Sequence, residues 1–206
     1  ILDETRTLAL GKDHFPYDRS KAMAQTEVLK SVDQGLNAVV VNPTAVLGPM
    51  DFKPSRMGDV LLSIYHNRYP VLIDGGYNWV DARDVAACAL AAETKGRPGQ
   101  SYLASGAWYH VCEIAHIVSE LYGRKTPQFA TPIWLCRAPA FCVTAVAKTL
   151  NMTTKFTPIA LKTLESHRNI SHEKATRELG YRPRPIKETI RDTLEWFRSQ
   201  GMLDPV

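Results

Sequence analysis

The sequence predicts an α/β fold, with the end of a parallel sheet near the start of the chain and a smaller helix-rich part after it. Residues 18–29 are mostly helix formers, Gly35 is a natural end for the helix, and the β-branched run 36–41 is typical of a buried strand. A helix, a glycine and a buried strand in this order form half of a βαβ crossover. After about residue 50, most apolar patterns have helical spacing.

The remaining elements follow from periodicity and turn residues. We expect a loop over 43–54, and we interpret Asp84 as the N-cap of an apolar helix rather than as a catalytic carboxylate. The patterns predict helices over 59–66, 83–92, 111–121, 172–179 and 185–200, and strands over 71–74 and 101–104. We expect residues 1–50 to end a sheet domain and residues 51–206 to form mainly a second domain, with some segments returning to the sheet.

Composition excludes several classes of protein. The chain has 206 residues, of which 45% are hydrophobic and 22% charged, with a net charge of +4. These values exclude a disordered or collagen-like chain. No run of five like charges occurs, so we expect no nucleic-acid partner. The most apolar stretch, 138–147, is too short to span a bilayer and is flanked by Arg137 and Lys148, so we expect no membrane segment.

The cysteine and histidine patterns indicate no metal site. Neither a CxxC pair nor an HxxxH pair occurs. Each cysteine lies among apolar residues, which is typical of reduced structural thiols in a cytoplasmic protein. The four are Cys88, Cys112, Cys136 and Cys142.

The first candidate for chemistry is the pair Tyr17 and Lys21. On a helix, residues four apart lie on one face, a turn from each other. An ammonium group so close favours the phenolate form of tyrosine, which suits the phenol for proton transfer to or from a carbonyl or alcohol oxygen. One such pair arises easily by chance, so its neighbours in the sequence decide its meaning.

Several motifs accompany the pair in a fixed order. The predicted strand continues into Asn42-Pro43-Thr44-Ala45-Val46, and Val80-Asp81-Ala82-Arg83-Asp84 and Glu178-Leu179-Gly180-Tyr181 follow later. On these residues the chain resembles the extended short-chain dehydrogenase/reductases, nearest to the branches of dihydroflavonol-reductase-like and nucleotide-sugar-epimerase-like proteins. The resemblance covers the chain from about Pro16 to the last predicted helix.

The resemblance implies a Rossmann-type parallel sheet and a nicotinamide site. Tyr17 would be the catalytic acid/base, and Lys21 would bind the nicotinamide ribose and promote ionisation of Tyr17. Cofactor contacts would come from Asn42, Pro43, Thr44 and Val46. The implied cofactor is NADP or NAD, the partner a small-molecule substrate, and the assembly a homodimer through the Tyr17 helix.

The implied activity is NAD(P)-dependent oxidation or reduction of an alcohol or ketone on a small organic substrate. The alternatives are a nucleotide-sugar epimerase or dehydratase, a non-catalytic NAD(P)-binding or interaction protein, and an inactive fragment. Residues from about 52 onward would form most of the substrate pocket. The apolar stretch Pro132–Leu150 is a candidate lid and favours a substrate less polar than a nucleotide sugar.

The chain departs from the family pattern in two ways. No GxGxxG or GxxGxxG motif occurs, although such a motif binds the cofactor pyrophosphate in the family. Only 16 residues precede Tyr17, so we assign no catalytic Ser or Thr. We therefore expect that the 206 residues are the C-terminal part of a longer enzyme, and that alone they bind NAD(P) poorly and are inactive.

Overall fold

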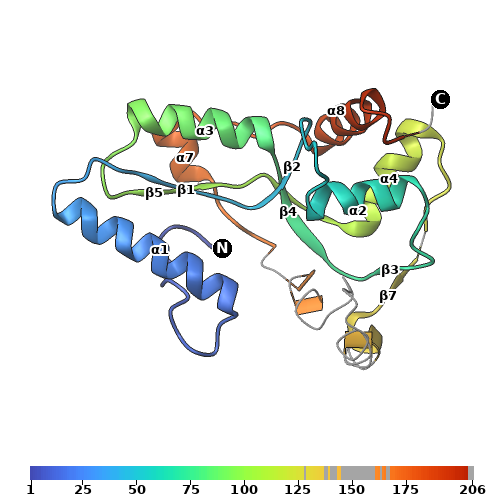
Figure 1. Cartoon of the computed structure of the whole chain (residues 1–206), viewed down its shortest axis with the longest axis horizontal. Helices are drawn as coiled ribbons and strands as arrows, with labels where there is room; N and C mark the ends of the chain where they lie inside the picture. Colours follow the sequence, from blue (N-terminus) through green and yellow to red (C-terminus); the bar gives the residue numbers. More distant parts are fainter. Residues whose placement is uncertain are drawn as a thin grey trace.

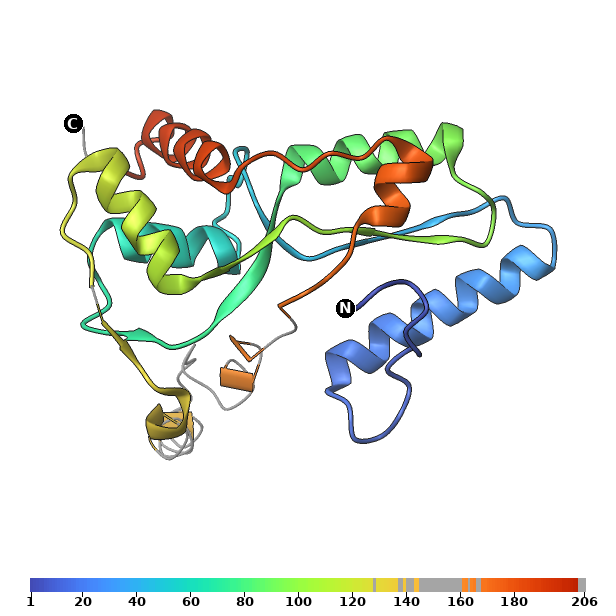
Figure 2. The ribbon, with the colours of Figure 1, turned by 180° about the vertical axis from the view of Figure 1, so that it is seen from behind.

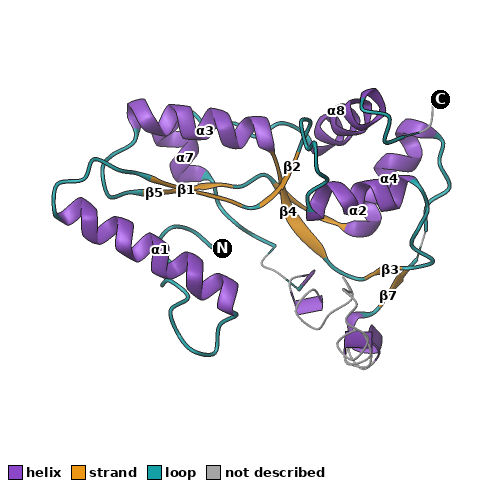
Figure 3. Ribbon diagram, viewed as in Figure 1, coloured by secondary structure: helices purple, strands orange, loops and turns teal. Residues whose placement is uncertain are grey.

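The computed structural model describes residues 1–127, 129–136, 139, 143–144, 161–162, 164–165 and 168–203. Within them the architecture is mixed α/β, with short strands in separate small sheets and helices around them (Figure 1, Figure 3). The elements are α1 (Pro16–Asp33), β1 (Val40–Pro43), β2 (Ala45–Leu47), α2 (Arg56–Tyr65), β3 (Leu72–Ile73), β4 (Gly76–Asp81), α3 (Ala82–Lys95), β5 (Ser101–Ala104), β6 (Ala107–His110), α4 (Val111–Tyr122), β7 (Ala130–Thr131), α7 (Glu173–Leu179) and α8 (Ile186–Ser199). The predicted α/β class is confirmed.

β1 and β5 form a parallel pair that builds one end of the molecule. Their register runs from Val40 opposite Ser101 to Pro43 opposite Ala104. α3 and α7 cover one side of this pair, and α1 lies on the other side (Figures 1 and 2). The apolar cluster beneath α3 and α7 includes Cys88, Tyr102, Ala104, Ala175 and Leu179. Segments far apart in the sequence thus form one layer, in which helices cover a pair of parallel strands.

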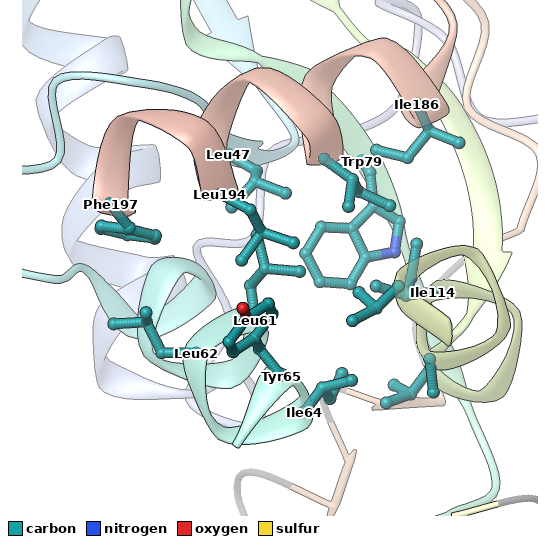
Figure 4. Packing of buried hydrophobic residues seen from close by; sticks show 14 of the residues in the cluster. Leu47, Leu61, Leu62, Ile64, Tyr65, Trp79, Ile114, Ile186, Leu194 and Phe197 are labelled. Atoms are coloured by element: carbon teal, nitrogen blue, oxygen red, sulfur yellow. The ribbon is translucent and has the colours of Figure 1, made fainter. Parts of the chain in front are cut away.

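The second layer is the sheet β2–β4–β6, in which β2 runs parallel and β6 antiparallel to β4. α2, α4 and α8 pack beside it around Trp79, which is 2% exposed (Figure 4). The fully buried side chains that meet there include Leu61, Ile64, Ile114, Ile190, Leu194 and Phe197. This apolar cluster joins elements from the middle and the end of the chain into one core.

Two strand predictions need correction. The first strand begins at Val40 and ends at Pro43, whereas the β-branched run predicted residues 36–41. Leu36 is 48% exposed, since the strand begins only where β5 supplies hydrogen-bonding partners. The predicted loop 43–54 contains β2, because Ala45–Leu47 pairs with β4, a partner that local sequence does not reveal.

The interpretation of Asp84 as an N-cap is wrong. The cap of α3 is Asp81, whose Oδ1 accepts a hydrogen bond from the backbone N–H of Arg83 at 2.8 Å. Asp84 lies in the first turn, and its carboxylate accepts from the backbone N–H and the Nε of Arg184, at 2.8 and 2.9 Å. A partner 100 residues away therefore gives this carboxylate its role.

Other features follow the sequence closely. α7 ends at Gly180 and α4 at Gly123, both left-handed, with φ of 75° and 62°. Cys88 and Cys136 are buried and Cys112 is half-buried, all three as free thiols.

Most of the candidate lid Pro132–Leu150, with Cys142, lies outside the described residues. In the described part of the chain, no helix has the length and apolarity to cross a membrane.

Candidate active site

The predicted catalytic pair lies on one face of α1. The helix begins at Pro16, so Tyr17 is in its first turn and Lys21 follows one turn later. Lys21 Nζ lies 5.7 Å from the centroid of the Tyr17 ring. The spacing in the sequence thus becomes a direct contact between an ammonium group and a phenol.

Gln25, one further turn along the same face, joins this helix to the parallel pair. Its Nε2 donates to Ser101 Oγ on β5 at 2.9 Å, and its Oε1 accepts from Asn42 Nδ2 on β1 at 3.3 Å. α1 and β1 run in opposite directions (Figures 1 and 2). Lys21 and Tyr17 therefore lie about 6 and about 12 Å further along the helix axis, toward the carboxyl end of β1.

The carboxyl end of β1 is held by a buried amide. Thr44 Oγ1 donates to Asn78 Oδ1 at 2.9 Å, and the backbone N–H of Gly106 donates to the same oxygen at 3.0 Å. Asn78 is 5% exposed. Gly106 is required here, since a Cβ would lie 1.9 Å from the carbonyl oxygen of Trp79. One side chain thus fixes the point where β1, β4 and β5 meet.

The side chains at this edge are open to solvent. Tyr17 is 71% exposed, and Lys21 and Pro43 are also exposed. Among the described residues no carboxylate pairs with Lys21. An accessible ammonium group and a phenol thus lie on the helix that Gln25 links to β1, toward the carboxyl end of this strand. The carboxyl ends of parallel strands are where ligands bind in open α/β sheets.

The structure places the predicted site residues in two groups, Tyr17 and Lys21 on α1 and Asn42, Pro43 and Thr44 at the end of β1, and Gln25 links the two. Asn42 and Thr44 are tied to Gln25 and Asn78, respectively, and Pro43 lies between them. Val46 is placed differently: it is in β2 opposite Val80 and packs against the apolar cluster beneath α3. Gln25 and Asn78 were not among the predicted site residues. The spacing of four from Tyr17 to Lys21 to Gln25 was a signal for Gln25, but nothing local marked Asn78.

A separate cavity of about 870 Å³ lies between α2, β3, β7 and five residues from later in the chain, namely Leu135, Cys136, Pro139, Leu161 and Leu164. None of the predicted site residues lines it. Lys162, next to the lining residue Leu161, contacts the residue before α1, because its Nζ lies 4.7 Å from the centroid of the Phe15 ring. Phe15 is two residues before Tyr17 in the sequence.

Comparison with known proteins gives one family. A sequence profile of the NAD dependent epimerase/dehydratase family matches residues 2–105. The chain is 31% identical over 189 residues to sterol demethylase protein B of Methylococcus capsulatus, covering 91% of this chain and 58% of that protein. It is 29% identical to a putative dihydroflavonol 4-reductase of Synechocystis, covering 90% of this chain and 55% of that protein. The chain therefore spans a little over half the length of these relatives.

Solved structures share the fold. The crystal structure of gox2253 matches with a TM-score of 0.82 and 28% identity, covering 98% of this chain and 62% of that one. A nucleoside-diphosphate-sugar epimerase from Pseudomonas aeruginosa matches with a TM-score of 0.76 and 22% identity, covering 95% of this chain and 59% of that one. These likenesses agree with the expected Rossmann-type architecture.

Proposed function

The chain belongs to the NAD-dependent epimerase/dehydratase family, and from that premise we propose that the protein is an NAD(P)-dependent oxidoreductase. It would move a hydride between the nicotinamide and a substrate carbon that bears a hydroxyl or carbonyl group. The observation that carries the proposal is the double hydrogen bond of Gln25. These bonds hold the Tyr17–Lys21 face of α1 against the strand end that begins with Asn42.

The donor set at this edge fits the nicotinamide end of the cofactor. A nicotinamide riboside offers ribose hydroxyls and a carboxamide, which need donors and acceptors at fixed positions. Lys21 supplies an ammonium group without a carboxylate partner among the described residues, while Asn42 and Thr44 supply an amide and backbone groups. We propose that these residues, together with Pro43 and Val46, hold the nicotinamide riboside.

In the proposed mechanism the bound nicotinamide supplies or accepts the hydride at the substrate carbon. For reduction, the Tyr17 hydroxyl donates its proton to the carbonyl oxygen, which becomes the product hydroxyl. The Lys21 ammonium stabilises the phenolate that this transfer leaves on Tyr17. Gln25 acts as a positioning residue, because it holds the helix that carries both groups.

The test is hydride transfer by the longest chain that the gene encodes, followed by the absorbance of reduced nicotinamide. The substrate panel contains a dihydroflavonol and a steroid ketone, chosen from the names of the two curated relatives. We expect Tyr17→Phe to lower kcat by about 100- to 10,000-fold, as for loss of a general acid, with NADPH affinity unchanged. Tyr109→Phe, a matched change on β6, should leave kcat unchanged.

Full turnover by the Tyr17→Phe variant would contradict the assigned role and favour a non-catalytic NAD(P)-binding protein on the same fold. A second candidate is an epimerase or dehydratase, which the family description also covers. An epimerase returns the hydride to the same substrate and keeps its cofactor. Steady consumption of NADPH with a ketone would exclude it.

We also propose a homodimer through α1. Ala22 is the buried residue of this helix, and Met23 is 56% exposed, so much of the helix surface is free to pack against a second copy. Light scattering that gives the mass of a monomer would reject the dimer.

The free thiols of Cys88, Cys112 and Cys136 support a cytoplasmic location, which cell fractionation tests.

A further inference from the structure

The cavity beside α2 has a mostly apolar wall. Its volume of about 870 Å³ lies near the upper end of the usual range for small-molecule sites, about 300–1,000 Å³. Apolar side chains form most of the described lining, among them Val60, Val71, Leu72, Ile73, Leu135 and Leu164. Such a wall stabilises a ligand by removing apolar surface from water.

The charges in the lining do not suit a polyanion. Within the described residues, the charged side chains of the lining are Arg56 and Asp59, one positive and one negative. The diphosphate of a nucleotide sugar carries two negative charges. One guanidinium together with a carboxylate would leave most of that negative charge unpaired. Placing an unpaired charge against an apolar wall costs free energy.

The polar groups of the cavity favour an uncharged oxygen. Tyr77 packs edge-on against Trp79, with ring centroids 5.5 Å apart, so its ring is held in place. Burial raises the pKa of the Tyr77 phenol, although Arg56 opposes this effect. The phenol therefore stays neutral near pH 7, where its hydroxyl donates to or accepts from a hydroxyl or carbonyl group.

We propose that this cavity binds the body of an uncharged, mostly apolar alcohol or ketone, with a ring system or a long chain, and not a nucleotide sugar. The inference rests on the proposed function and specifies its substrate class. Lys162, which follows the lining residue Leu161, contacts Phe15, and Phe15 is two residues before Tyr17. An elongated ligand that extends past Leu161 would bring one end toward the start of α1.

The test measures binding of the neutral apolar dye Nile red by fluorescence, in the longest chain that the gene encodes and without cofactor. Leu135→Asp places a carboxylate in the cavity wall at a side chain that is 48% exposed, so the fold tolerates it. We expect it to weaken dye binding by about 10-fold. Leu90→Asp, on the 67% exposed surface of α3, is the matched control and should bind like the unchanged protein.

A displacement experiment uses uridine diphosphate as the competitor of the dye. Uridine diphosphate should not displace the dye. The inference fails if uridine diphosphate displaces the dye and Arg56→Gln abolishes that displacement, because the cavity then takes a nucleotide. It also fails if Leu135→Asp and Leu90→Asp bind the dye equally.

The two proposals fail in different ways. Dye binding without cofactor does not involve Tyr17, so Tyr17→Phe should bind Nile red normally. Tyr17-dependent turnover together with absent dye binding overturns only the substrate class. Cavity-dependent dye binding without Tyr17-dependent hydride transfer overturns the oxidoreductase and leaves an apolar ligand site.

Discussion

Replacing Arg184 with methionine should destabilise the fold far more than an average surface change. Its guanidinium lies 2.8 Å from Asp84 Oδ1 through Nη2 and donates to the same oxygen through Nε at 2.9 Å. The Asp84 side chain is 7% exposed, whereas the Arg184 side chain is 26% exposed. Methionine keeps the aliphatic stem and removes the charge. Among the described residues, the nearly buried carboxylate then keeps only its hydrogen bond from the Arg184 backbone N–H.

The magnitude follows from these contacts. Removing one partner of a fully buried ion pair costs about 3–5 kcal/mol. Because Arg184 remains a quarter exposed and one backbone hydrogen bond survives, we reduce the expected loss in free energy of unfolding to about 2–3 kcal/mol. The pair with Asp84 raises the pKa of the Arg184 guanidinium, which agrees with a net attraction.

Urea unfolding of the purified protein measures the effect, with Arg97→Met as the matched control. Arg97 pairs with Glu178 in a similar way, but its side chain is 64% exposed. An exposed ion pair contributes little, so the control should lose much less stability. Equal losses for Arg184→Met and Arg97→Met would refute the argument from burial, as would a loss for Arg184→Met below about 0.5 kcal/mol.

Two further predictions use the same network and the α1 contact. Burial disfavours the charged form of Asp81, but hydrogen bonds from Arg83 outweigh it and hold the pKa of this carboxyl below its usual value. The pKa of Asp81 is lower in the folded protein than in the unfolded chain, where it is about 3.9, so the ionised carboxylate stabilises the fold above that pH. The free energy of unfolding should therefore fall as pH drops below about 4. Arg83→Met should make the free energy of unfolding depend less on pH in this range. Gln25→Ala removes two hydrogen bonds, each worth about 0.5–1.5 kcal/mol, so amide exchange in α1 should accelerate by about 5-fold or more. Glu27→Ala on the exposed face of α1 is the control, and equal exchange in the two variants would remove the positioning role of Gln25.

Helices were predictable where a periodic apolar pattern met a clear stop. The patterns for α4, α7 and α8 and the glycines at 123 and 180 act through local backbone preference, so they needed no partner. The short strands were harder to predict. β2 has three residues and β6 has four, and both are strands because β4 lies beside them. The residues of a short strand do not indicate which other strand will pair with it.

The candidate site divides in the same way. Tyr17 and Lys21 could be paired from the sequence, since a spacing of four puts them on one helix face. Asn78 could not be found, because its carbonyl oxygen joins Thr44 and Gly106, which are 34 and 28 residues away. The domain boundary near residue 50 stays a prediction.

The sequence by itself determined the α/β class, the family resemblance, most helices and the pairing of Tyr17 with Lys21 on one helix face, because each depends on residues within a few turns of one another. Only the tertiary structure decided that Asp81 caps α3 while Asp84 binds Arg184, where the strands begin, and which side chain fastens α1 to the sheet. It also revealed the apolar cavity beside α2. These features are contacts between distant segments, and the free energy that selects them comes from burial and hydrogen bonds that form only when the chain has folded.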